Sequence, residues 1–76
     1  MSEQHTRIIE ITVQIQTKFV QALVANDFTE FQSVTQLSIS YFDKETTSFL
    51  LDTLRPIISP KLAMRLVEFL SRRAND

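Results

Sequence analysis

The residues most able to react are the hydroxyl-bearing serines and threonines and the one histidine, His5. A hydroxyl becomes a nucleophile only beside a general base that a third group holds in place. His5 is the side chain best suited to act as that base near neutral pH, but it lies in a polar segment at the N-terminus. We therefore expect the hydroxyl groups to cap helices or to face water, and not to carry out catalysis.

Carboxylates offer a second kind of chemistry, because two of them in a cleft can act as general acid and general base. Asp43 stands near Glu45 and Asp52 in the sequence. Asp43 directly precedes a predicted helix, where it suits the N-cap, and Asp52 belongs to the polar side of that helix. The chain has no cysteine and no glycine, which excludes thiolate metal sites and glycine-rich phosphate loops. The sequence therefore predicts a protein that is not an enzyme and that uses no metal or cofactor.

The cationic residues of the last predicted helix are the third candidate. Lys61, Arg65 and Arg72 align on one side of that helix, with Arg73 nearby. Nucleic-acid-binding domains usually carry a basic charge as a whole, whereas the net charge here is −1 and Glu68 lies within the stripe. We interpret the stripe as a solvated helix face, with binding to a partner or to nucleic acid as the alternative.

The stretch from Arg7 to Ala25 predicts a long helix with an unusually broad apolar side. At 3.6 residues per turn, its polar residues gather on one strip. An apolar arc this broad needs neighbouring helices on two sides. The polar strip contains Arg7, Glu10, Gln14, Thr17, Lys18 and Gln21, and the apolar arc contains Ile8, Ile9, Ile11, Val13, Ile15, Phe19, Val20, Ala22, Leu23 and Val24.

Part of the same stretch also fits a β-strand. Between Ile9 and Gln16, β-branched apolar residues alternate with polar ones, which is the period expected of a half-buried strand. The strand pattern accounts only for this part, whereas the helical pattern accounts for nearly all of Arg7 to Ala25. We therefore predict a helix.

Three further helices are predicted over residues 28–42, 44–55 and 61–73. Asp27, Asp43 and Ser59 are suitable N-cap residues for them, and Asn26 suits the left-handed conformation that ends the first helix. A proline after residue 55 stops the third helix, and we expect the apolar connector of residues 56–58 to pack onto the bundle. Residues 37–42 also alternate like a strand, so helix and strand both remain open there.

These elements predict a single all-α domain over residues 1–76, a small bundle of about four helices with residues 1–6 and 74–76 flexible. The absence of glycine disfavours tight hairpins. A chain this small buries only a modest part of its surface and here has no disulfide, so we expect homodimerisation to complete the fold. The aromatic residues predicted to lie in the core are Phe28, Phe31, Tyr41, Phe42, Phe49 and Phe69.

The predicted dimer pairs two copies of the first helix. We favour the edge that carries Ile9, Val13 and Val20, because Gln16 lies beside it and can meet its symmetry mate, as a buried polar residue does when it fixes register. The other interpretation places Gln16 at a rim, where it reaches water. The predicted interface residues are Ile9, Val13, Gln16, Val20 and Leu23.

If residues 37–41 form a strand, the C-terminal half of the chain runs strand, helix, connector, helix. That order resembles the ribbon-helix-helix repressors. The resemblance implies a dimer that pairs two such strands and lays their outward side chains, here Ser38 and Ser40, in the major groove. The chain departs from the family in lacking basic or amide residues at those positions and a glycine in the turn between the helices.

The function predicted from these features is that of a small regulatory or adaptor protein that binds itself and another protein. The alternative is a dimeric DNA-binding transcriptional regulator of ribbon-helix-helix or helical type. No apolar run approaches the ~18 residues of a membrane span, and the N-terminus lacks the basic and apolar regions of a secretory signal. We therefore expect a cytoplasmic protein with no membrane contact.

Overall fold

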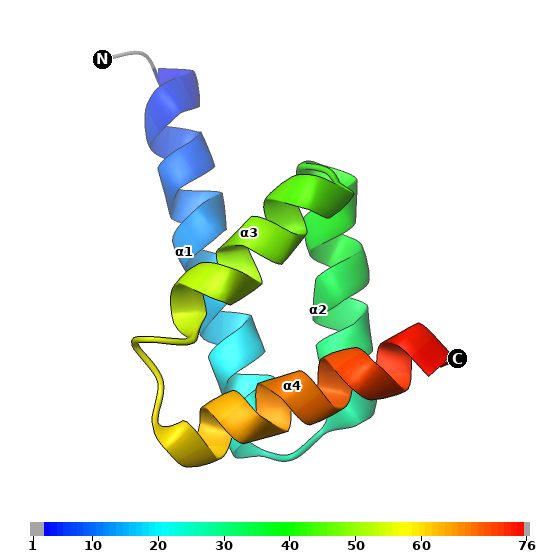
Figure 1. Cartoon of the computed structure of the whole chain (residues 1–76). Helices are drawn as coiled ribbons and strands as arrows, with labels where there is room; N and C mark the ends of the chain where they lie inside the picture. Colours follow the sequence, from blue (N-terminus) through cyan, green and yellow to red (C-terminus); the bar gives the residue numbers. More distant parts are fainter. Residues whose placement is uncertain (1–2, 76) are drawn as a thin grey trace.

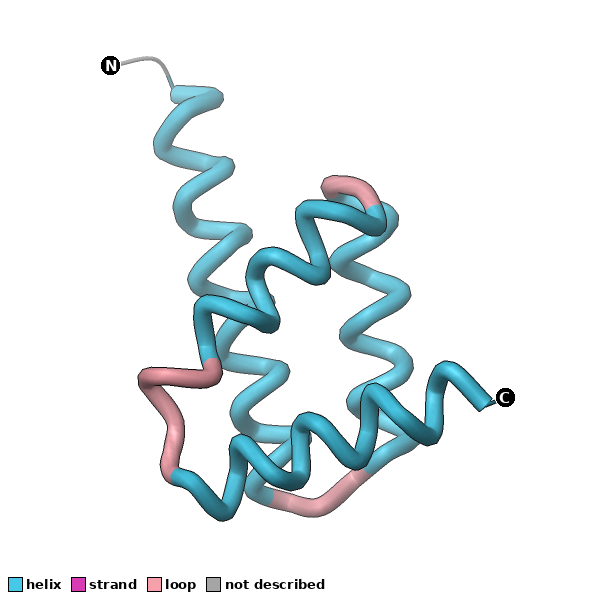
Figure 2. The backbone as a smooth tube through the Cα atoms, viewed as in Figure 1, coloured by secondary structure: helices cyan, strands magenta, loops and turns pink. Residues whose placement is uncertain are grey.

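A computed structural model of the chain describes residues 3–75, which form four α-helices and no strand (Figure 1). The helices are α1 (Glu3–Val24), α2 (Phe28–Tyr41), α3 (Lys44–Leu54) and α4 (Pro60–Asn75). Short loops over residues 25–27, 42–43 and 55–59 join them (Figure 2). The prediction of an all-α bundle of about four helices is confirmed.

The helices begin at the predicted caps. Asp27 Oδ1 accepts a hydrogen bond of 3.0 Å from the Glu30 amide, and Asp43 Oδ1 accepts one of 2.6 Å from the Thr46 amide. Each bond satisfies one of the amides that a helix N-terminus leaves without an intrahelical partner. Ser59 Oγ accepts from the Leu62 amide at 3.3 Å in the same way.

The end of α1 also follows the prediction. Asn26 has a φ of 55° and is the one residue with positive φ among those that the structure describes. Asparagine tolerates this left-handed conformation better than most residues. It turns the chain so that the Asp27 amide donates 3.0 Å to the Ala22 carbonyl oxygen, which satisfies one of the last carbonyls of α1.

Two helices are longer than expected. α1 begins at Glu3, four residues before the predicted start at Arg7, and α4 continues to Asn75, beyond Arg73. Helix therefore extends into both terminal segments predicted to be flexible. The polarity of these segments suggested loops, but a polar residue is compatible with a helix when the helix end projects into solvent.

The core lies where the four helices meet. In Figure 1, α3 and α4 cross in front of α1 and α2, and the N-terminal part of α1 projects beyond the other helices. Phe31 of α2 is fully buried at the centre, with ring centroids 5.4 Å from Phe19 of α1 and 5.2 Å from Phe69 of α4. The tilted arrangement of these rings is the favourable one for aromatic pairs. The buried residues of the core are Ile15, Phe19, Ala22, Leu23, Phe31, Val34, Leu51, Leu54, Leu66 and Phe69.

A buried hydroxyl pair joins α2 to α3. Thr47 Oγ1 donates 2.8 Å to the Asp43 carbonyl oxygen and lies 2.7 Å from Ser38 Oγ. A threonine hydroxyl has one hydrogen, so Ser38 must be the donor in the contact between the two hydroxyls. Both side chains are almost completely buried, and the bond satisfies both without water.

Residues 37–41 lie in α2, so the strand alternative for this segment is wrong. Within α2, Ser38 is buried against Thr47 of α3, whereas Ser40 is exposed. The two serines of LSISY therefore have different surroundings, although a strand would place them on the same face. Two aromatic residues also differ from expectation. Tyr41 and Phe49 are not in the core: Phe49 is 65% exposed, since α3 turns Leu50, Leu51 and Leu54 inward instead.

The Ser38–Thr47 bond predicts opposite effects for two neighbouring substitutions in α2. Ser38→Ala should lower the free energy of unfolding by about 1 kcal/mol, because it removes a buried hydrogen bond. Ser40→Ala should raise it by about 0.5 kcal/mol or less through helix propensity alone. Urea denaturation of both variants checks this, and equal effects would show that Ser38 is not buried against Thr47.

The cap of α3 predicts a pH dependence. Hydrogen bonds from the Thr46 backbone amide and side chain lower the pKa of Asp43 below its usual value of 3.8. Folding therefore favours the ionised carboxylate, and the resulting stability is present above pH 3.8 and disappears as pH falls through the lowered pKa. Asp43→Asn keeps a capping side chain that does not titrate. Wild type should therefore have the higher free energy of unfolding near neutral pH, and this advantage over the variant should become smaller as acid protonates Asp43. A constant difference would contradict the assignment.

Candidate protein-binding surface

The surface of α1 divides into three parts around the helix axis. One part faces the core and contains Ile15, Phe19 and Ala22. A second part is the predicted polar strip, all of which is exposed. Between them lies a mainly apolar strip that the rest of the chain covers only in part, which we call the α1 seam. The α1 seam consists of Ile9, Val13, Gln16 and Val20.

The α1 seam includes four of the five predicted interface residues. Ile9 is 50% exposed and Val13 is 55% exposed, while Gln16 and Val20 are half-buried. Leu23 is the exception, because its side chain is fully buried in the core of its own chain and reaches no surface. The four residues follow one another at intervals of 4, 3 and 4, which is the spacing that places side chains along one contact line between paired helices.

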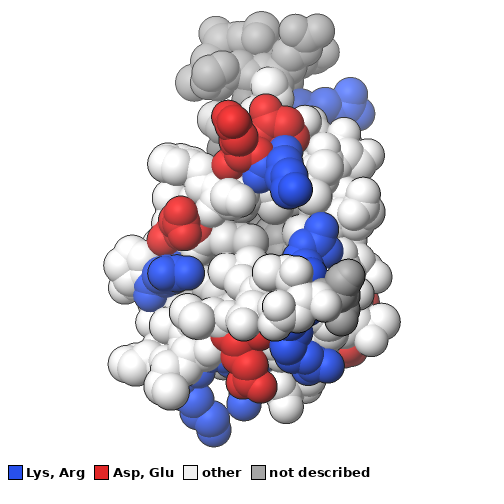
Figure 3. Space-filling model, turned by 45° about the vertical axis from the view of Figure 1, so that its right-hand side comes forward, with Lys and Arg blue, Asp and Glu red and all other residues white. Residues whose placement is uncertain are grey.

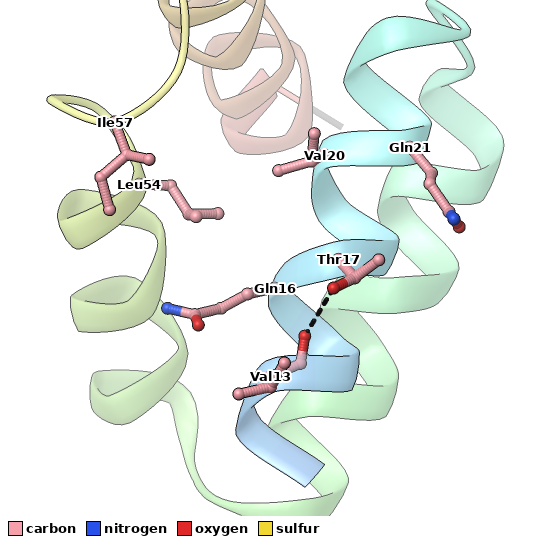
Figure 4. Close-up of a pocket in the computed structure, with 7 residues that line it drawn as sticks. All are labelled: Val13, Gln16, Thr17, Val20, Gln21, Leu54 and Ile57. Atoms are coloured by element: carbon pink, nitrogen blue, oxygen red, sulfur yellow. Dashed lines mark hydrogen bonds between the residues drawn. The ribbon is translucent and has the colours of Figure 1, made fainter. Parts of the chain in front are cut away.

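A shallow apolar groove adjoins the α1 seam where α1 passes α3. We call it the α1–α3 groove, and it is lined by Val13, Gln16, Thr17, Val20, Gln21, Leu54 and Ile57. In Figure 4, Val13, Gln16 and Val20 extend from α1 toward α3, whereas Thr17 and Gln21 lie on the other side of the helix. The Thr17 hydroxyl donates a hydrogen bond of 2.9 Å to the Val13 carbonyl oxygen. Its hydrogen is therefore used within α1.

Ile57 is the residue of this surface that the sequence misplaced. The connector between α3 and α4 was expected to pack onto the bundle, and Ile58 does pack against the core, but Ile57 is 76% exposed. The Ile57 and Ile58 amides both donate 3.0 Å to the Leu54 carbonyl oxygen. This turn directs the two neighbouring side chains differently, and two consecutive isoleucines in a sequence do not reveal which one faces water.

The N-terminal part of the α1 seam lies on a projecting segment, residues 6–13, which we call the α1 arm. α1 has 22 residues and α2, which returns beside it, has 14, so α1 is longer by eight residues or about 12 Å. Ile8 and Ile9 of the α1 arm are both at least half exposed. The length mismatch explains why these isoleucines have so little cover from their own chain.

One residue of the predicted cationic face of α4 is held within the chain. Arg65 is half-buried, and its Nη1 donates 2.7 Å to the Leu23 carbonyl oxygen. A cation at this position complements the negative C-terminal end of α1. Arg65 therefore ties α4 to α1, and the interpretation of this residue as part of a solvated face is wrong.

The other three cations of α4 differ in their surroundings. Lys61 is exposed. The Arg72 guanidinium carbon lies 4.1 Å from the centroid of the Phe28 ring, a cation–π contact. Arg73 is half-buried and lines a separate hollow with Lys44. Figure 3 shows Lys and Arg interspersed with Asp and Glu on the face in view, so no broad basic area is seen there.

Reactive groups do not assemble elsewhere in the described residues. No three of their His, Cys, Asp and Glu side chains are placed to hold a metal ion, and every buried side-chain polar atom among them has a hydrogen-bond partner. Asp43 acts as a helix cap. Asp52 Oδ1 lies 4.0 Å from Arg55 Nε, an ion pair at the surface. The side chain of His5 lies outside the described part. No helix within that part is both long and apolar enough to cross a membrane.

Comparison of the chain with protein-family models, with curated proteins and with solved structures finds no match.

The Arg65 contact predicts a stability effect that an exposed cation would not have. Arg65→Met keeps an apolar stem but removes the hydrogen bond to the end of α1, so it should lower the free energy of unfolding by about 1–2 kcal/mol. Lys61→Met, on the same helix, should change it by less than about 0.5 kcal/mol. Thermal or urea unfolding measures both, and a neutral Arg65→Met would show that the contact is absent in solution.

Proposed function

We propose that this protein is a non-enzymatic regulatory or adaptor protein that acts through protein–protein contacts, and that its first partner is a second copy of itself. The observation that carries the proposal is the α1 seam, three apolar residues and Gln16 at heptad-like spacing, of which Ile9 and Val13 are at least half exposed. Monomeric proteins rarely leave such a contiguous apolar strip in water.

A second copy suits the α1 seam because of its composition. None of Ile9, Val13, Gln16 or Val20 carries a charge, so two copies meet without repulsion between like charges at the contact. A twofold interface uses the same patch on both subunits. Gln16 is half-buried beside the groove, and in a dimer its amide can bond to the same residue of the other copy, which satisfies it as it loses water.

The apolar contribution is sufficient for association of modest strength. Complete burial of one such side chain is worth about 1.5–3 kcal/mol, so a half-exposed one gains about 1 kcal/mol. The exposed Ile9, Val13 and Ile57 of both copies, six side chains, together approach about 6 kcal/mol, which is of the same order as the 4–15 kcal/mol cost of association. We therefore expect the dimer to dissociate on dilution.

Nucleic-acid binding has less support. The ribbon-helix-helix arrangement requires a strand at residues 37–41, and these residues form part of α2. Arg65 and Arg72 are already engaged within the chain. We therefore propose a protein partner as the target of the dimer.

Adjacent residues of α1 provide a matched test of the dimer. Val13 lies in the α1 seam and Gln14 lies in the polar strip, and both are exposed in the isolated chain. Val13→Glu should yield a folded monomer, because it would bury an unpaired charge only in the dimer. Gln14→Glu adds the same charge outside the contact and should leave the dimer intact.

Sedimentation velocity over a concentration series measures the association, and circular dichroism verifies the fold of each variant. The wild-type thermal midpoint should rise with protein concentration, as for any folded state stabilised by self-association. A wild-type chain that remains monomeric at hundreds of micromolar would disprove the proposed dimer. Equal behaviour of the two variants would exclude the α1 seam as its interface.

A further inference from the structure

We propose that the two α1 helices of the dimer run antiparallel, so that the α1 arm of each copy lies against the α1–α3 groove of the other. This inference rests on the proposed dimer and specifies its geometry. It follows from a difference along the α1 seam, because Ile9 projects beyond the α1–α3 groove, whereas Val13, Gln16 and Val20 border that groove.

The projecting end is the α1 arm. Ile9 and Val13 are at least half exposed there, and Figure 1 shows this end of α1 extending past α2 and α3. The groove begins at Val13 and continues past Gln16 to Val20, and its far wall is formed by Leu54 and Ile57, so Ile9 alone of the α1 seam lies beyond it. The groove has a volume of about 350 Å³, which suits apolar side chains rather than a second whole helix.

The two possible orientations treat these ends differently. In a parallel pair, α1 arm meets α1 arm and groove meets groove, so the two hollows face each other and lose packing contacts. In an antiparallel pair, the projecting isoleucine of one copy enters the hollow of the other. Well-packed interfaces reach the density of protein interiors, and only the antiparallel pair brings a protrusion to each hollow. The opposed helix dipoles favour the same orientation by a smaller amount.

The spacing of the α1 seam permits this reversal. Intervals of 4, 3 and 4 residues are the same in both directions. Two copies of the α1 seam can therefore pair antiparallel with each seam residue opposite a seam residue of the other copy. Ile9 then lies opposite Val20 of the second copy, and Val13 lies opposite Gln16. The two Gln16 side chains flank the twofold axis, separated by three residues or about 4.5 Å along the helix, and their amides can meet across the axis.

The same register places Ile9 near Ile57 of the second copy. Ile57 is 76% exposed, the highest fraction among the large apolar residues whose burial the structure describes, and it borders the groove beside Val20. The antiparallel pair therefore covers one apolar residue outside α1 as well as the α1 seam itself. Ile57 is thus the residue of the α3–α4 connector that we assign to the interface.

Single cysteines distinguish the two orientations, since the natural chain has none. Ile9→Cys and Val20→Cys introduce small apolar side chains that preserve the character of the seam. The two variants, one of them with a mass tag, are unfolded together, refolded and oxidised with glutathione. The antiparallel pair should give the mixed 9–20 disulfide, because only residues with Cα atoms within about 7 Å can be bridged.

In the antiparallel pair, residues 9 and 9 of the two copies are offset by 11 positions, or about 16 Å along the helix, so the 9–9 and 20–20 disulfides should be rare. Arg7→Cys with Lys18→Cys is the control, because these residues are also 11 positions apart but lie exposed on the polar strip, away from the seam. Mass spectrometry of the linked peptides identifies each bridge.

The outcomes separate this inference from the proposed function. A dimer by sedimentation that forms 9–9 and 20–20 bridges, or no bridge above the control, would overturn the antiparallel arrangement and leave the dimer standing. Absence of a dimer would overturn both. As a second measurement, Ile57→Glu should weaken dimerisation at least tenfold without loss of helicity, since Ile57 is exposed in the single chain, whereas exposed Lys61→Glu should have no such effect.

Discussion

The structure depends on a mismatch between one long apolar helix and three shorter neighbours. α1 has 22 residues, whereas α2, α3 and α4 have 14, 11 and 16. The apolar surface of α1 extends around more than one side and along most of its length. The bundle covers the side that carries Ile15, Phe19 and Ala22. The rest of that surface is left to water or to a partner.

The same constraint shapes the interactions that hold the bundle together. The C-terminal half of α1 is where the core is built, since Phe19 and Leu23 are fully buried and the tilted rings of Phe31 and Phe69 pack beyond them. Arg65 adds a charged hydrogen bond at the end of this half, on the Leu23 carbonyl oxygen. The stabilising contacts of α1 are therefore concentrated at one end, since within residues 6–13 Ile11 is partly buried against the core and Ile8, Ile9 and Val13 are exposed.

This separation gives the chain two distinct roles along one helix. The buried half of α1 determines the fold, and substitutions there act on stability. Ile9 and Val13 of the α1 seam are exposed in the single chain, so polar substitutions at these two residues can alter association while the fold persists. A protein that works by binding needs such a separation, because an interface that also formed the core could not be changed without unfolding. The proposed function and the proposed geometry of the dimer both rely on it.

Local chemistry by itself determined where α2, α3 and α4 begin and where α1 ends. Helix ends depend on interactions within a few residues, so they could be predicted from the sequence. The examples are the N-caps Asp27, Asp43 and Ser59 and the left-handed Asn26. The broad apolar arc of α1 likewise predicted most of the α1 seam. Only the tertiary structure decided which part of that arc is covered, because coverage depends on the lengths and crossing of the other helices. The burial of Leu23, the bond between Ser38 and Thr47 and the contact of Arg65 with α1 each depend on a helix other than the residue's own. The exposure of Ile57 depends on the turn after α3. The local sequence pattern reveals neither kind of cause.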